Sequence, residues 1–497
     1  MIKFIKIIAC LLLMPSAALS QEKDLAHGIK VGSKKFTEGV ILGEIITQLA
    51  RISYKSTEHL KELGGTRILW NALRKGDIDI YPEYTGTIRE EIFAGKIKTD
   101  AEARKKLHEL GIEMSRPLGF NNTYALGMKQ SIAGKLGIKK ISDLQKHKEL
   151  KFGLSNEFMD RKDGWPGLRD RYKLSGENVT GLDHDLSYRG LENGSIDVVD
   201  LYSTDAEIKY YNLKILEDDF NYFPEYKAVI LYRSNLKKNA PEVLNSVLRL
   251  ESNIPESSMV SMNAKVKLDL IPEGAVAAEF IQKKFGLRTE FVKDNFFTRL
   301  LAYSREHIYL VSVSLFWAVI FSVPIGILAY KKKKFSVFIL GLTGIIQTIP
   351  SLALLVFMIP LLGIGSWPAI AALFLYSLLP IVRNTYSGLQ NIPLHIRESA
   401  EVLGLSWFYK LWLIELPLAL PSILAGIKTS AVINVGTATL GALIGAGGYG
   451  QPILTGIRLD NMSLILEGAV PAALLALTVQ LIFDLLEKII VPRGLRL

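Results

Sequence analysis

The charged residues of this chain are distributed so unevenly that two different kinds of folding unit are required. Charges are dense over residues 21–305, whereas residues 308–497 contain long stretches without any. The chain has 497 residues, about three times the length of a typical domain. With hydrophobic residues at 49% it is also too apolar for a disordered chain. These observations predict a soluble domain joined to a membrane domain.

The second part contains enough apolar sequence for five membrane spans. A helix needs about 20 apolar residues to cross the hydrocarbon core of a bilayer. The stretches that meet this length are 308–330, two within 335–382 that break at 363–368, about 421–445, and about 463–483. Pro350 should kink the second span, because proline removes a helical hydrogen bond and clashes with the preceding turn.

The N-terminus and the basic residues together predict the topology. Residues 1–20 have a basic start, a short apolar core and a small-residue ending, the pattern of a secretory signal peptide cleaved after Ser20. A lipoprotein-like box ending at Cys10 leaves lipidation as an alternative. An external start and five spans place the C-terminus in the cytoplasm, together with the basic cluster 331–334. The predicted outer loops contain one basic residue, Arg458, beside Asp460. We therefore expect a multi-pass protein of the cytoplasmic (inner) membrane.

The cytoplasmic loop between the third and fourth spans has a pattern of its own. Apolar and charged residues alternate on both sides of Gly404, which predicts a short amphipathic helix, a glycine turn and a second helix. Residues 398–417 resemble the EAA loop of ABC-importer permeases and depart from it at Ser399, where that family has alanine. The matching residues are Glu398, Ala400, Gly404, Ile414, Leu416 and Pro417. The resemblance implies docking to a cytoplasmic ATPase, and the alternative is a membrane-surface connector.

Several kinds of site are not expected in this chain. Its seven histidines are scattered and it has one cysteine, so we predict no metal and no cofactor. The phosphate-binding pattern G-x-x-x-x-G-K-[ST] occurs nowhere, so ATP and Mg should bind to a separate ATPase subunit. The chain has a net charge of +10, and its clearest basic cluster, residues 331–334, directly follows an apolar stretch. This placement favours membrane lipid over nucleic acid as the partner of the basic residues.

A glycine-rich segment follows the fourth span. Gly445, Gly447 and Gly450 match G-x-G-x-x-G, but no βαβ unit surrounds them, so a dinucleotide site is not expected. Gly441 and Gly445 also form G-x-x-x-G, which indicates either close helix packing or a glycine-rich gate region.

Residues 28–290 alternate short apolar strands with helical patterns, which predicts an α/β fold. Residues 29–33 are typical of a strand, and an amphipathic helix should follow over about 38–51. The segment 76–85 aligns without gaps on 194–203, and each copy is a helix end, a short strand and a Tyr-[Thr/Ser] pair. Because ligands bind beyond the carboxyl ends of such strands, the repeat predicts two lobes around a shared cleft.

Four tyrosines stand at predicted strand ends. Tyr84 and Tyr202 end the two copies of the repeat, whereas Tyr124 and Tyr226 lie just before other apolar strands. A single tyrosine is more often a packing or surface residue. Four in similar settings favour a binding site.

The soluble part resembles the substrate-binding proteins of quaternary-ammonium importers, the ProX/OpuC type for glycine betaine, carnitine and choline. The matching segments are 32–38, 63–66, 81–87, 201–205 and 223–226. The resemblance implies a two-lobed periplasmic-binding-protein fold of type II, fused to an all-α permease of the type I importer class. The expected boundaries are 1–20 for the signal peptide, 21–290 for the extracytoplasmic binding domain, 291–305 for a linker and 306–490 for the permease.

The resemblance also implies the binding residues. A cage of aromatic rings would hold the trimethylammonium group, whose diffuse positive charge is attracted to ring faces. The cage residues are Tyr84, Tyr124, Tyr202 and Tyr226. A second group would contact the carboxylate of a betaine, where a guanidinium can form two parallel hydrogen bonds. Its members are Lys34, Thr87 and Arg161.

The sequence as a whole predicts the receptor and translocation subunit of an ATP-driven importer of betaine-type solutes, with osmoprotectant uptake as its role. Choline and ergothioneine fit the same architecture. The family implies a homodimer with two ABC ATPase subunits. A sensory receptor would need a cytoplasmic signalling domain, yet eight residues follow Ile489. A membrane-anchored enzyme would need a nucleophile–base or metal constellation, which the sequence does not reveal, so we expect no enzyme.

Overall fold

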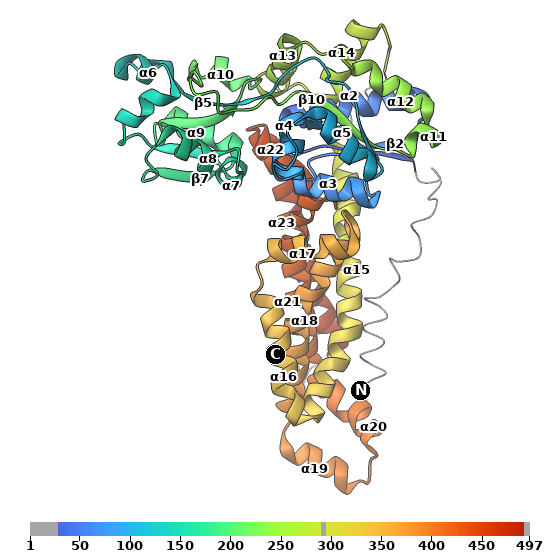
Figure 1. Ribbon diagram of the computed structural model, residues 1–497. Helices are drawn as coiled ribbons and strands as arrows, with labels where there is room; N and C mark the ends of the chain where they lie inside the picture. The colour runs from blue at the N-terminus through green and yellow to red at the C-terminus, as the bar shows by residue number, and fades with distance from the viewer. Residues whose placement is uncertain (1–27, 290–294, 492–497) are drawn as a thin grey trace.

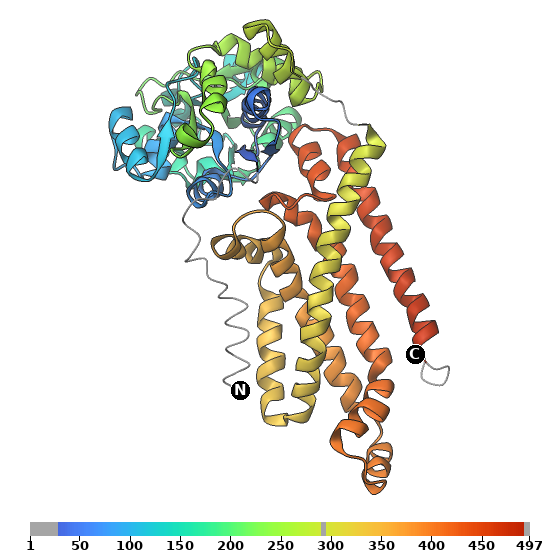
Figure 2. The same cartoon turned by 90° about the vertical axis from the view of Figure 1, so that its right-hand side faces the viewer.

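The computed structural model describes residues 28–289 and 295–491. Figures 1 and 2 show a two-lobed α/β domain at one end of a bundle of long helices, which confirms the predicted division of the chain. The signal peptide, the alternative at Cys10 and the last six residues lie outside the described residues.

The first lobe is built on a five-stranded sheet with the order β2-β1-β3-β10-β4. Its strands are β1 (Ile29–Gly32), β2 (Thr57–Leu60), β3 (Ile80–Tyr84), β4 (Ile112–Met114) and β10 (Ala228–Arg233). Strand β1 is parallel to β2 and β3, whereas β10 is antiparallel to both of its neighbours. The helices of this lobe are α2 (Thr37–Ser53), α3 (Thr66–Lys75), α4 (Thr85–Thr87), a π-helix (Ile88–Ile92), α5 (Asp100–Glu109), α11 (Leu236–Asn239), α12 (Pro241–Val247), a 3-10 turn (Leu248–Leu250), α13 (Glu256–Lys267) and α14 (Glu273–Phe285).

The second lobe repeats this arrangement with the order β7-β6-β8-β5-β9. Its strands are β5 (Tyr124–Lys129), β6 (Phe152–Ser155), β7 (Val179–Leu182), β8 (Val198–Tyr202) and β9 (Leu213–Ile215). Its helices are α6 (Gln130–Leu136), a 3-10 helix (Ile141–Lys146), α7 (Asn156–Asp160), α8 (Trp165–Tyr172), α9 (His184–Asn193) and α10 (Glu207–Tyr210). The two copies of the sequence repeat form β3 and β8, the central strands of the two sheets, so the predicted two-lobed fold is confirmed.

The chain crosses between the lobes twice, over residues 115–123 and 216–227. An isolated antiparallel bridge joins Asn121 to Lys227, so the crossings lie side by side. The side-chain oxygen of Asn121 also accepts a hydrogen bond from the backbone N–H of Tyr226 at 2.7 Å. Each crossing leads directly into the antiparallel strand of the lobe it enters, β5 or β10. The crossings therefore place strand ends of both lobes at one shared edge.

The membrane domain begins with one long helix and ends with another. Its main helices are α15 (Phe296–Lys331), α16 (Lys333–Thr348), α17 (Ser351–Leu362), α18 (Ser366–Gln390), α21 (Leu416–Ala438) and α23 (Met462–Ile490). Among the described residues, four helical segments are long and apolar enough to span a membrane, or five when α16 and α17 count as one broken span. These two helices meet at 98°, directly beside Pro350, which confirms the predicted kink. The predicted break at 363–368 is also present, because α17 ends at Leu362 and α18 begins at Ser366.

The expectation of a linker over 291–305 is wrong for residues 296–305, which form the first turns of α15. At 36 residues α15 is about 54 Å long, more than the roughly 30 Å of a bilayer core. Charged residues are compatible with this extension because they find partners. Arg299 Nε donates to the carboxylate of Glu467 on α23 at 3.0 Å.

The far end of the bundle contains the predicted helix, glycine turn and helix. Its elements are α19 (Leu394–Val402), α20 (Trp407–Lys410) and a π-helix (Leu411–Glu415) that continues into α21. Gly404 has a φ of +68°, a left-handed conformation that favours glycine. Both views show this loop at the end opposite to the α/β domain.

Candidate functional site

One of the four predicted cage tyrosines, Tyr124, contacts two of the others. Tyr124 opens β5 and is paired across the sheet with Tyr202, the last residue of β8. The Tyr124 ring lies 5.1 Å from the Tyr202 ring and 5.5 Å from the Tyr226 ring, between centroids. Tyr124 and Tyr226 are buried, and Tyr202 is partly buried.

The fourth tyrosine joins this group through a residue that the sequence reasoning missed. Tyr84, at the end of β3, lies 6.1 Å from the ring of Phe36, and Phe36 lies 5.8 Å from the ring of Tyr202. Phe36 therefore connects the aromatic residues of the two lobes. The signal was present, because Phe36 falls inside the segment 32–38 that matched the receptor family.

Arg161 packs against the same rings. It follows α7, and its guanidinium carbon lies 5.5 Å from the Tyr124 ring centroid and 5.9 Å from that of Tyr226. Two nitrogens of Arg161 donate to Asp163 at 2.8 and 2.5 Å, and a third donates to Glu91 of the first lobe at 3.1 Å. Burial disfavours its charge, yet its surroundings, including the bonds to Asp163, raise the pKa of Arg161. The cation is thus already neutralised by protein carboxylates.

Lys34 and Thr87 both lie in the first lobe, and Lys34 is close to the rings. The buried ammonium of Lys34 donates to Glu83 at 2.6 Å and lies 5.7 Å from the Tyr84 ring centroid. Thr87 is buried on α4. A Cβ built on the preceding Gly86 would lie 2.5 Å from the ring of Tyr226, so the glycine lets α4 approach that ring. The structure therefore gathers six of the seven predicted residues around one cluster and places Thr87 next to Gly86, which packs on Tyr226, while their contacts to a solute stay a prediction.

Glu38 is the central acceptor of the site and was missed as a site residue. Its carboxylate accepts hydrogen bonds from Tyr84 Oη at 2.6 Å, Asn122 at 2.9 Å, Thr204 at 2.6 Å and Asn263 at 3.2 Å. Burial raises the pKa of this carboxyl group. The donors to Glu38 come from both lobes, from a crossing and from α13. Glu38 therefore joins four separate segments around the predicted cage.

A cleft beside Tyr202 separates the two lobes. Its lining includes Lys34 and Phe36 from the first lobe, and Glu157, His184 and Tyr202 from the second. The imidazole of His184 lies 4.6 Å from the Tyr202 ring between centroids, and its Nε2 is 3.1 Å from a carboxylate oxygen of Asp205. The cleft therefore combines aromatic faces with charged groups of both signs.

The structure also brings together a serine, a histidine and a glutamate, which no sequence pattern indicated. Ser33 Oγ is 2.8 Å from His59 Nε2, and His59 Nδ1 is 2.9 Å from Glu44. Ser33 is completely buried, and a Cβ on Gly43 would lie 2.3 Å from His59, so no space for a substrate adjoins the pair. These residues join β1, α2 and β2 as a structural network. No group of residues suited to hold a metal is found within 28–289 and 295–491.

The loop expected to contact an ATPase presents an apolar surface. Glu398 and Pro417 are exposed, whereas Ala400 is buried. Large apolar side chains around them are exposed by between 54% and 88%. They are Leu394, Val402, Leu403, Trp407, Phe408, Trp412 and Leu413.

Comparison with known proteins agrees with both halves of the chain. Residues 27–283 match the family described as the substrate binding domain of ABC-type glycine betaine transport systems. Residues 322–495 match the binding-protein-dependent transport system inner membrane component.

Two curated relatives and one solved structure illustrate the similarity. The glycine betaine/carnitine/choline transport system permease protein OpuCB of Bacillus subtilis (strain 168) is 41% identical over 197 residues, covering 40% of this chain and 91% of that protein. The ergothioneine transport permease/ergothioneine binding protein EgtU of Helicobacter pylori (strain G27) is 33% identical over 286 residues, covering 56% of this chain and 51% of that protein. A crystal structure of a glycine betaine/carnitine/choline ABC transporter covers 51% of this chain and 98% of its own, with 28% identity and a TM-score of 0.44.

The match to the binding-domain family alone spans more than half of the chain, and the permease match follows it. The chain therefore belongs to the ABC-type glycine betaine transport family, as a substrate-binding domain fused to an inner-membrane permease.

Proposed function

We propose that the solute of this receptor–permease is a betaine-type quaternary ammonium compound, taken up as an osmoprotectant. The observation that carries the proposal is the aromatic cluster around Tyr124, to which both lobes contribute rings. These rings already hold a diffuse cation, because the Arg161 guanidinium lies over two of them. A trimethylammonium group has no N–H to donate, so a carboxylate offers it no hydrogen bond, whereas each ring face attracts its diffuse charge by about 0.5–2 kcal/mol.

The charged groups near the rings support a carboxylate at the other end of the solute. Of the two carboxylates on Arg161, Asp163 is the more buried, with 8% of its side chain exposed against 21% for Glu91. A solute carboxylate could therefore take the place of Glu91 on Arg161 and keep Asp163 in position. Choline has no carboxylate for this exchange. The name of the relative EgtU gives ergothioneine as its solute. Ergothioneine is also a betaine, so it fits the same proposal.

A panel of glycine betaine, carnitine, choline and ergothioneine tests the solute class. With the binding domain 21–290, each ligand that binds should raise the free energy of unfolding by about 2.7 kcal/mol at a hundred times its Kd. We expect the carboxylated compounds to bind more tightly than choline in calorimetry. Tighter binding of choline would contradict the proposal that Arg161 binds a solute carboxylate. If none of the compounds bound, the quaternary ammonium assignment would be rejected.

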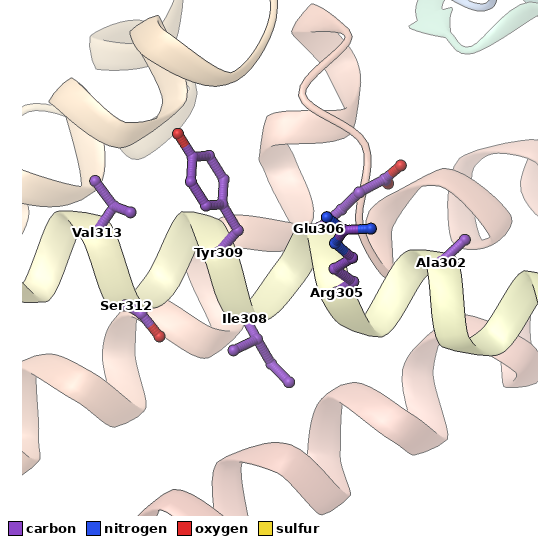
Figure 3. A pocket seen from close by; sticks show the side chains of 7 residues that line it. All are labelled: Ala302, Arg305, Glu306, Ile308, Tyr309, Ser312 and Val313. Atoms are coloured by element: carbon purple, nitrogen blue, oxygen red, sulfur yellow. The ribbon is translucent and has the colours of Figure 1, made fainter.

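We further propose that the binding domain and outer loops face the extracytoplasmic side, that the C-terminus is cytoplasmic, and that the chain works as a homodimer. A groove along the outer half of α15 supports the dimer, since polar groups on a membrane helix rarely face lipid. Figure 3 shows Glu306, Tyr309 and Ser312 among the residues that line it. This face would be directed at the second copy and at the translocation pathway. ATP and Mg would bind to two ABC ATPase subunits, and the chain itself would hold no cofactor.

The exposed apolar loop 398–417 supports docking of those ATPase subunits, and Gly404 offers a test. No atom would lie within 4 Å of a Cβ at Gly404, so a side chain there would disturb the left-handed turn and its partner rather than the chain's own packing. We expect Gly404→Val to abolish ATPase co-purification and ATP-driven uptake while solute affinity is unchanged. Gly137→Val is the matched control, because Gly137 has a φ of +70° and equally open surroundings in the binding domain. Normal uptake by Gly404→Val would leave the loop as a surface connector.

Uptake itself separates an importer from a sensory receptor. Vesicles that contain the chain and its ATPase should accumulate the bound solute only when ATP is supplied on the side of the coupling loop. Binding without accumulation would favour the receptor alternative.

A further inference from the structure

Arg458, the basic residue of the last outer loop, is buried in an ion cluster with the binding domain. It ends α22 (Gly450–Arg458), a short helix that Figures 1 and 2 show directly beneath the α/β domain. Its guanidinium donates to the carboxylates of Glu62 and Glu273, and to Thr37 Oγ1 at 3.2 Å. The side chains of Arg458, Glu62 and Glu273 are exposed by 5%, 3% and 10%. Charges this deeply buried are unfavourable unless fully paired, so the pairing has to be specific.

One face of α22 is shaped for the loop that contains Glu62. Gln451, Thr455 and Arg458 follow the helical spacing that places residues on one face. All three donate to Glu62, with distances of 2.8 Å from Gln451 and 2.9 Å from Thr455. Glu62 has a φ of +57°, a backbone conformation that is unfavourable for a side chain of this size and needs support from its surroundings. The three hydrogen bonds that Glu62 accepts from the permease supply that support.

The glycine-rich segment before α22 receives the next residue of the same loop. A Cβ on Gly445 would lie 2.6 Å from the side chain of Leu63. The backbone N–H of Gly448 donates to Glu306 of α15 at 2.7 Å, which holds the segment in position. The sequence interpretation of close helix packing is therefore not what Gly445 shows, because its neighbour is a loop residue of the binding domain.

The permease contacts both lobes while the lobes contact each other. In the first lobe, Lys75 donates to the carbonyl oxygens of Ile359 and Pro360, at 3.2 and 2.7 Å. In the second lobe, Arg189 pairs with Asp460 beside the anchor. Between the lobes, the guanidinium of Arg161 donates to Glu91, and Nζ of Lys35 lies 3.4 Å from a carboxylate oxygen of Asp183. The lobes are therefore held together in the arrangement that the permease contacts.

The residue that binds the cage tyrosine Tyr84 is the direct neighbour of an interface residue. Thr37, which accepts a hydrogen bond from Arg458, precedes Glu38, which accepts from the cage residue Tyr84 and from Thr204 after β8. Both residues belong to the first turn of α2. A shift at the permease surface would therefore act on the group that orders the cage.

We propose that α22 and the glycine segment 445–448 form a docking seat for the chain's own binding domain, that Arg458 is its anchor, and that docking and solute binding strengthen each other. The reason for the coupling is that the seat contacts the lobes in the arrangement that brings the cage tyrosines together. The coupling rests on the proposed function, whereas the seat itself does not. The short connection between α14 and α15 keeps the binding domain at high effective concentration above this seat.

Hydrogen exchange on the full-length chain in lipid nanodiscs tests the seat. In Arg458→Ala, backbone amides of residues 60–64 and 451–458 should exchange about tenfold faster or more, because a buried carboxylate pair loses its cation. Arg299→Ala is the matched control, since it breaks an arginine–glutamate pair between α15 and α23 inside the membrane domain. Glu62→Gln tests the seat from the other side and should free residues 451–458 even if Arg458→Ala disturbs folding of the permease. Unchanged exchange in both variants would overturn the seat.

A cross-link distinguishes a chain's own binding domain from that of a second copy. Arg189→Cys and Asp460→Cys replace a neighbouring pair between the binding domain and the permease and leave Arg458, Glu62 and Glu273 intact. They are introduced together with Cys10→Ser, because Cys10 is the one native cysteine, and are joined by a short thiol-reactive cross-linker. An intramolecular link between 189 and 460 in a chain that migrates as a monomer supports docking within the chain. A cross-linked dimer would show that the second copy supplies the domain, and this would overturn the proposal as stated.

The coupling has a test of its own. For glycine betaine, choline and ergothioneine, Arg458→Ala in the full-length chain should weaken binding about fivefold or more, and saturating solute should slow exchange at the seat of the wild type. Equal affinities in the wild type and the variant would overturn the coupling and leave the seat. Failure of the wild type to bind any of the three solutes would instead reject the proposed function.

Discussion

Tyr84 and Tyr202 end the central strands of two sheets with the same strand order, yet their surroundings differ. The hydroxyl of Tyr84 donates to the buried carboxylate of Glu38, and its ring is covered by Lys34 and Phe36. The ring of Tyr202 is partly exposed beside the cleft and is faced by His184, Phe36 and Tyr124. The repeat thus places the two tyrosines equivalently, but the neighbouring helices decide what each one does. Tyr84 is held by its hydroxyl on Glu38, whereas Tyr202 lines the cleft between the lobes.

The largest difference between the lobes should be in the stability that each buried cation contributes, Arg161 in the second lobe and Lys34 in the first. Arg161→Ala would leave the buried Asp163 without its cation and beside Tyr226, and we expect a loss of about 3–5 kcal/mol in the free energy of unfolding. Lys34→Ala should cost less, about 1–3 kcal/mol, because burial raises the pKa of its partner Glu83 and so lets that group become neutral. Denaturant unfolding of the two variants measures both values. Equal losses would mean that the pairs are equivalent and that Glu91 adds nothing to the pair in the second lobe.

The next largest difference should be in what the hydroxyl groups of the two tyrosines contribute. Tyr202→Ala should weaken solute binding by about 0.5–2 kcal/mol for the lost ring, and Tyr202→Phe should restore it. Tyr84→Phe should not be neutral, because it removes a hydrogen bond to a buried carboxylate and should lower the free energy of unfolding by about 1–3 kcal/mol. Calorimetry gives the affinities and thermal unfolding the stabilities. If Tyr202→Phe bound as weakly as Tyr202→Ala, the hydroxyl rather than the ring face would carry recognition at this position.

Local features of the molecule could be predicted from the sequence, whereas contacts between distant segments could not. The central strands, the kink at Pro350 and the glycine turn at Gly404 were predictable, because each depends on a pattern within a few residues. The bond from Arg161 to Glu91 and the four donors to Glu38 were not, since they join segments brought together by the crossings between lobes. Arg458 was noticed as an isolated outer charge, but its partner Glu62 lies 396 positions earlier in the chain. Position along a strand is local information, whereas the partner of a buried charge is set by tertiary packing.

The smallest expected effect is a difference in how the two lobes respond to pH. Next to Tyr84, burial raises the pKa of Glu38 above its ordinary value of 4.5. The folded chain then holds this proton more tightly than the unfolded chain, so the contribution of Glu38 is complete below about pH 4.5 and is lost as pH rises through its folded pKa.

In the second lobe Asp205, which accepts from the backbone N–H of Tyr202 at 2.8 Å, has the opposite shift. Burial opposes its charge, but His184 and other donors lower its pKa below 3.8 overall, so its contribution is present above that pH and is lost as pH falls through the folded pKa. Denaturant unfolding between about pH 3 and 8 should therefore show Glu38→Gln losing the decrease above pH 4.5, and Asp205→Asn losing part of the decrease on the acid side. Each slope is bounded at about 1.4 kcal/mol per pH unit for one proton. Parallel pH profiles for the two variants would show that the carboxylates beside the two tyrosines are equivalent after all.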